Sequence, residues 1–77
     1  MNLVEFSELI VKKITKEPDL VKVQEFTTDD ETVIEIIVSE EDMGRVIGKQ
    51  GRIAKAIRTV MRNVAKIDNK KVTVEIK

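Results

Sequence analysis

Two glycines separated by a lysine and a glutamine form the segment Gly48-Lys49-Gln50-Gly51. Because glycine has no Cβ atom, the backbone of such a segment can come close to an anionic group. A helix that begins directly after the second glycine would also point its free N–H groups and the positive end of its dipole at that group. Lys49 and Arg52 add mobile positive charge beside the loop. The pattern predicts a loop that holds phosphate.

Charge is distributed unevenly along the 77 residues, although the formal net charge is zero. Residues 1–43 contain four lysines and twelve aspartates or glutamates, which gives a net charge of −8. Residues 44–77 contain ten lysines or arginines and two acids, which gives a net charge of +8. The second half, which includes the glycine loop, therefore carries the charge needed to meet an anionic partner.

Most residue types that enzyme chemistry requires are missing. The chain has no histidine and no cysteine, and no serine lies in a nucleophile motif. The glycine loop also lacks the Gly-Lys-Ser/Thr ending with which nucleoside triphosphatases hold metal and phosphate. We therefore expect a protein without catalytic activity and without a cofactor or metal site.

The composition and the first residues indicate a cytoplasmic protein. Residues 1–10 include Glu5 and Glu8 and lack the basic leader and the unbroken apolar run of a signal peptide. No stretch approaches the roughly 20 apolar residues of a membrane span. The absence of cysteine fits a reducing compartment. We expect no association with membranes.

The first half of the chain predicts one helix and two strands. Apolar residues recur at spacings of three and four over residues 2–16 and predict a helix that must stop before Pro18. Alternating valines predict a strand over residues 20–26, and a run rich in isoleucine and valine predicts a second strand over residues 32–39. Because this second run has few polar positions, it should be the central strand, with both faces at least partly covered.

The glycine loop should join two helices. Ser39 is a suitable N-cap, and the acids after it favour a short helix that runs through Val46 or Ile47. A longer helix should follow Gly51, and alternation over residues 72–77 predicts a closing strand. The longer helix has an apolar face made of Ile53, Ile57, Val60, Met61 and Val64. Its opposite face is basic and contains Lys55, Arg58, Arg62 and Lys66.

The predicted order is therefore α-β-β-α-α-β in one α+β domain over residues 1–77. A short connection makes the first two strands antiparallel, and a helical crossover makes the second and third strands parallel neighbours. We expect a three-stranded mixed sheet with all three helices on one face and the other face relatively open.

The sequence around the loop resembles the KH family of RNA-binding domains. The segment 42–59 reads DMGRVIGKQGRIAKAIRT, with an acidic helix before the glycines and a basic amphipathic helix after them. Together with the element order, it resembles the type II, prokaryotic KH arrangement over essentially the whole chain. It is also similar to small stand-alone bacterial KH proteins. KH domains clamp about four nucleotides of single-stranded RNA with this loop.

The resemblance assigns roles to particular residues. It implies that the RNA backbone contacts the four loop residues Gly48, Lys49, Gln50 and Gly51, and that Ile47 and Ile57 support the loop from the core. It also implies that Val38 and Val46 form the apolar floor of a groove for the bases. The rim of this groove would contain Arg45, Arg52 and Lys55. It also implies post-transcriptional regulation or RNA chaperone activity, as a homodimer or with a larger KH-containing protein.

Other readings of the same residues stay open. On spacing alone, the basic face of the long helix has roughly even odds of being an ordinary solvated surface, and beyond Lys55 we expect long-range attraction more than contact. Phe6 and Phe26, the only aromatic residues, should pack in the core or at an edge, so recognition of base sequence should be limited. The rival function is a protein-interaction module with little affinity for RNA. A dimer could form through the open sheet face or through the loop and its flanking helices.

Overall fold

The computed structural model describes residues 2–77 and has the predicted α+β element order. Residue 1, where the predicted domain begins, lies outside the described part of the chain. The elements are α1 (Leu3–Ile14), β1 (Lys22–Thr27), β2 (Thr32–Ile37), α2 (Glu40–Ile47), α3 (Arg52–Ile67) and β3 (Val72–Ile76), with short 3₁₀ turns η1 (Pro18–Leu20) and η2 (Lys49–Gly51).

The sheet has the strand order β1-β2-β3. β1 runs antiparallel to β2, with Lys22 opposite Ile37 and Thr27 opposite Thr32. β3 runs parallel to β2, as the helical crossover formed by α2 and α3 requires. The predicted mixed sheet and the central place of the second strand are confirmed.

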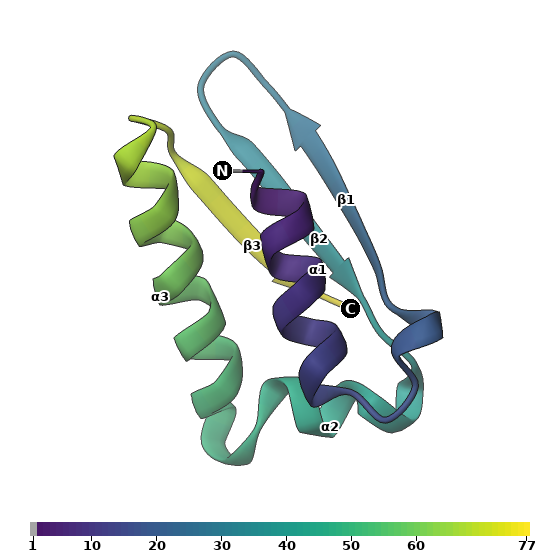
Figure 1. The fold of residues 1–77 in the computed structure, drawn as a ribbon. Coiled ribbons are helices and arrows are strands. Elements are labelled where there is room, and N and C mark those ends of the chain that lie inside the picture. Colours follow the sequence, from purple (N-terminus) through teal and green to yellow (C-terminus); the bar gives the residue numbers. More distant parts are fainter. Residues whose placement is uncertain (1) are drawn as a thin grey trace.

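The helices form a layer on one side of this sheet, as predicted (Figure 1). α1 packs against β1 and β2, α3 packs against β3, and α2 lies at one end of the layer, where it contacts both other helices. On the opposite face, an ion pair of 2.8 Å joins Lys77 Nζ to Glu35 Oε2. Among residues 2–77, no helix has the length and apolar character that crossing a bilayer would require.

The core lies between the sheet and the helix layer. Side chains of a strand alternate between its faces, so Ile34 and Ile36 are wholly buried while Val33 and Ile37 are only half-buried. Each helix adds at least one side chain without exposed surface. These side chains are Val11, Val46 and Met61.

The buried stripe of α3 differs from the predicted one. Ile57 and Met61 are buried as expected, but Ile53 and Val60 leave 40% and 41% of their surface exposed. Ala54 and Ala65 are buried in their place, because small side chains let α3 approach the sheet closely. The predicted apolar face is thus wider than the surface that the sheet and α1 cover.

Two predicted boundaries shift at the connection between α1 and β1. The helix predicted over residues 2–16 ends at Ile14, and Leu20, predicted to be in the first strand, belongs to the η1 turn. Pro18 stands at the first position of this turn, where its fixed φ is favourable. The strand therefore begins later, at Lys22.

Candidate nucleic-acid interface

The backbone of the glycine loop adopts positive φ at three of its four residues. Gly48 has φ 79°, Gln50 has φ 58° and Gly51 has φ 73°. A Cβ atom on Gly48 would lie 2.6–2.9 Å from three side-chain carbons of Ile53, so both conformation and space require glycine there. Gln50 holds its left-handed conformation at a cost on the order of 1 kcal/mol. The positive φ angles thus form a tight turn between α2 and α3.

Among the three α-helices of residues 2–77, α3 alone starts without a side-chain cap. Asn2 caps α1 by accepting from the Val4 and Glu5 N–H groups, and Ser39 caps α2 by accepting from the Asp42 N–H. Both helices also carry acids in their first turn. α3 begins after Gly51 with neither a capping side chain nor an acid. The positive end of its dipole is therefore available to an external anion.

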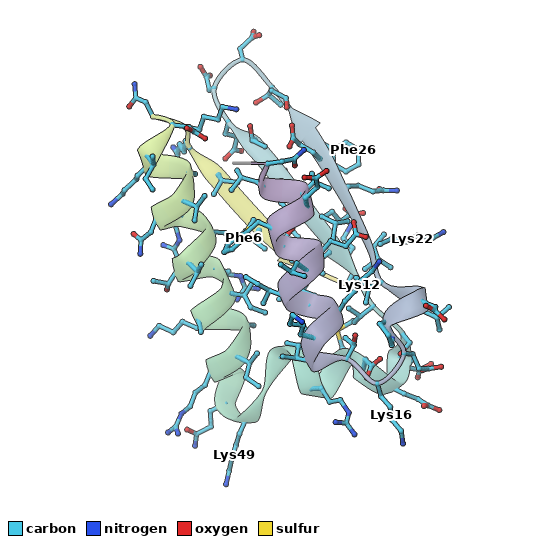
Figure 2. The ribbon with its side chains drawn as sticks, in the orientation of Figure 1. Phe6, Lys12, Lys16, Lys22, Phe26 and Lys49 are labelled. Carbon is cyan, nitrogen blue, oxygen red and sulfur yellow. The ribbon has the colours of Figure 1, made fainter. Side chains whose placement is uncertain are left out.

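Exposed basic and polar side chains surround this helix start. Lys49 points away from the molecule at the tip of the loop (Figure 2). Arg52 Nη2 donates a 3.0 Å hydrogen bond to Gln50 Oε1, which links the helix start to the loop. Lys55 lies one turn further along α3 and is exposed. None of these three cations forms an ion pair with an acid of the described residues.

Arg45 is also exposed at the end of α2, and its Nε atom lies 3.7 Å from Asp42 Oδ1. One end of the helix layer thus contains the glycine loop together with the predicted rim residues Arg45, Arg52 and Lys55.

The residues predicted to form an apolar floor lie elsewhere. Val46 has no exposed surface and Val38 exposes 8%, so both belong to the core and neither is accessible to a base. Ile57 is buried, as a residue that supports the loop should be, whereas Ile47 is 38% exposed. The inward face of α2 packs against α1 and α3, which removes Val46 from any groove. These two valines therefore do not form the apolar floor for the bases that the resemblance implied.

A cleft of about 230 Å³ opens between α3 and the outer edge of β3. Arg58 and Arg62 line it on the helix side, and Val72, Thr73 and Val74 line it on the strand side. Arg58 Nε donates a 3.3 Å hydrogen bond to the Val74 carbonyl oxygen. The sequence pattern predicted that both arginines lie on a basic helix face. It did not predict which strand lies beside them, because β3 is a separate element later in the chain.

A second cleft, about 320 Å³ in volume, lies between α1 and α3. We call it the apolar groove. Besides the buried Ile57 and the aliphatic part of Arg52 at one end, its lining consists of Ile10, Ile14, Ile53, Ala56 and Val60. The groove was not predicted, because the apolar spacing of these residues also matches a buried helix face.

Asp42 fixes the position of α2, a role that was not predicted. Its carboxylate has no exposed surface and accepts 2.8 Å hydrogen bonds from the backbone N–H groups of Lys16 and Glu17. Ser39 Oγ donates to it at 3.3 Å. The hydrogen bond from Lys16, followed by those from Glu17 and Ser39 and the charge of Arg45, lowers the pKa of Asp42, although burial opposes the shift. This carboxylate ties the end of α1 to the helix that leads into the loop.

An α-β-β-α-α-β chain with a three-stranded mixed sheet and a glycine loop between its second and third helices is a type II KH domain. The chain belongs to the KhpA/KhpB KH-domain family, whose model matches residues 4–76. It is 53% identical over 72 residues to the RNA-binding protein KhpA of Clostridium perfringens, covering 94% of this chain and 96% of that one. It is 42% identical over 72 residues to KhpA of Chlamydia trachomatis, covering 94% and 92%.

Two solved structures of Era contain a similar fold. A variant of Aquifex aeolicus Era bound to GDP·AlF4⁻ superposes with a TM-score of 0.67 at 26% sequence identity. Era in complex with MgGDPNP and nucleotides 1506–1542 of 16S ribosomal RNA superposes with a TM-score of 0.66 at 27% identity. The match covers 96% of this chain in both cases, but only 29% and 28% of the Era chains.

Proposed function

We propose that this chain is an RNA-binding protein that clamps about four nucleotides of single-stranded RNA with the loop Gly48-Lys49-Gln50-Gly51. The observation that carries the proposal is the start of α3, which has no side-chain cap and no acid, whereas α1 and α2 have both. The KhpA relatives are named RNA-binding proteins, which supports the proposal. Such a role is non-catalytic, in post-transcriptional regulation or as an RNA chaperone in the cytoplasm.

The proposed grip works through the RNA backbone. Phosphate would be attracted by the positive end of the α3 dipole, since the N–H groups of Gly48, Gly51 and Arg52 already donate within the chain. The side chains of Lys49 and Arg52 would add charge-assisted contacts. The lack of a Cβ at Gly51, where a Cβ would point into open space, allows this close approach, whereas glycine at position 48 makes room for Ile53. An ordinary helical duplex cannot offer four splayed nucleotides to one loop, so single strands should be preferred.

We expect the affinity for single-stranded RNA to exceed that for a duplex of the same length and to depend only weakly on salt. Neutralising about three phosphates at about 0.7 each gives a slope of log K against log salt near −2. Fluorescence polarisation with a labelled oligonucleotide at several salt concentrations measures both quantities. Tighter binding to the duplex would contradict the proposal. A slope steeper than about −5 would mean that the whole basic face of α3 contacts RNA.

We also propose that the chain pairs through the apolar groove, either with a second copy or with a larger KH-containing protein. Ile53 and Val60 are each about 40% exposed there. Apart from Arg52 at one end, the lining is apolar, so it can meet its own copy about a twofold axis while burying little charge. Pairing would put two loops on one RNA and raise a weak affinity through effective concentration. The groove is also the feature that favours the rival function, a module that binds protein with little RNA affinity.

Sedimentation velocity should show a dimer at tens of micromolar protein, and Val60→Asp should make it monomeric. The charge would have to be buried in the contact, which is unfavourable. Thr59→Asp is the matched control, because Thr59 is the exposed neighbour of Val60 and does not line the groove. A monomer both with and without a short RNA would refute homodimerisation. Dissociation on adding RNA would instead identify the loop as the shared surface.

A further inference from the structure

One wall of the cleft between α3 and β3 consists of strand backbone that does not take part in the sheet. Within residues 2–77, β3 pairs with β2 alone, so its other edge is open. Hydrogen bonds from Thr32 N–H to the Lys71 oxygen and from Lys77 N–H to the Ile36 oxygen show that odd-numbered residues of β3 face β2. Alternation then directs the N–H and carbonyl groups of Val72 and Val74 into the cleft.

Arg58 is held in this cleft in one orientation. It is half-buried, and the hydrogen bond from its Nε to the Val74 oxygen fixes the plane of the guanidinium group. The donors on Nη1 and Nη2 remain, and no acid of residues 2–77 forms an ion pair with Arg58. A guanidinium group held in this way presents parallel donors to a planar pair of acceptors.

The cleft lies within reach of an RNA strand held at the loop. Arg58 is seven residues after Gly51 on α3, about 10 Å along the helix axis at 1.5 Å per residue. α3 separates this cleft from the apolar groove, which is on the side of α1. α3 and β3 contact each other, and Figure 1 shows them nearest to one another toward the C-terminal end of α3. Pairing through the groove would therefore leave the cleft open.

We propose that Arg58 selects guanine at the nucleotide whose base enters this cleft. The inference rests on the proposed RNA-binding function and adds a base preference to it. Guanine offers two adjacent acceptors, N7 and O6, which match the arginine fork. Adenine places its N6 amino donor where guanine has O6, so the same fork would meet a donor. Arg62, exposed one turn further along α3, attracts the phosphate that follows.

The test measures the affinity of the full chain for short uridine oligonucleotides that contain one guanine or one adenine at each position in turn. We expect the best guanine position to bind roughly tenfold more tightly than adenine there. Inosine, which keeps O6 and N7, should retain the preference, and 7-deazaguanine, which lacks N7, should lose most of it. Arg58→Lys, which keeps the charge but lacks the fork, should reduce the preference to about twofold or less.

Arg62→Lys is the matched control and should keep the full preference for guanine. If Arg58→Lys and Arg58→Gln weaken guanine and adenine oligonucleotides equally, with a salt slope reduced by about 1 for the glutamine variant, Arg58 binds phosphate and the proposal is wrong. A preference for guanine that survives Arg58→Lys would also overturn it. Failure of the wild-type chain to bind any of the oligonucleotides would reject the RNA-binding function itself, whereas equal binding of all of them would reject only the base preference.

Discussion

Replacing Lys49 and Gln50 together by aspartate is expected to weaken RNA binding by on the order of 100-fold or more, because two carboxylates would then face phosphate. Both side chains are exposed, and Lys49 extends into solvent (Figure 2). Asp tolerates the left-handed conformation found at position 50 better than most residues. The fold should therefore remain intact, and the loss should concern binding alone.

The measurement is a polarisation titration of the double variant, with circular dichroism to verify its fold. Lys22→Asp with Gln24→Asp is the matched control, since it exchanges the same two residue types on the exposed surface of β1 and changes the net charge equally. The control should bind RNA within about threefold of the wild-type chain, because β1 is remote from the loop and charge effects at such distance are screened. Undiminished binding by a folded loop variant would reject the loop as the RNA site.

Asp42→Asn should lower the melting temperature by at least about 10 °C, a large shift for a domain of this size. The asparagine oxygen can accept from only one of the Lys16 and Glu17 N–H groups. Its amide nitrogen would face the other as a second donor, and a buried N–H group without an acceptor is destabilising. Glu41→Gln, in the same first turn but exposed, is the control and should shift the melting temperature by no more than about 2 °C.

The contribution of Asp42 should also depend on pH. Because its pKa in the folded chain is lowered from an ordinary value of 3.8, the stabilisation is fully present above that value. It is lost as the pH falls through the lowered pKa of the folded chain. Urea unfolding at a series of pH values should therefore show the wild-type chain and Asp42→Asn converging below about pH 4. A difference that stays constant down to pH 2 would show that hydrogen bonding to the ionised carboxylate is not the cause.

Sequence patterns predicted the elements well where one local rule decides the outcome. The glycine pair between two helices, the N-cap at Ser39 and the alternation over residues 72–77 each depend on neighbours along the chain. Sequence patterns failed to predict the role of a residue where that role depends on partners distant along the chain. Asp42 looked like an ordinary first-turn acid, but the end of α1, about 25 residues earlier, turns back and buries it.

The element order, the mixed sheet and the glycine turn between α2 and α3 follow from the sequence, because helix periodicity, strand alternation and glycine conformation act over a few residues. Which side of each element is covered depends on how the elements pack together. Packing buried Val46, which the resemblance placed in an apolar floor for the bases, and left Val60 exposed, although it lies on a predicted apolar face. It also set Arg58 against the edge of β3, 16 residues later in the chain. Burial is a property of the assembled layers, and no single segment specifies it.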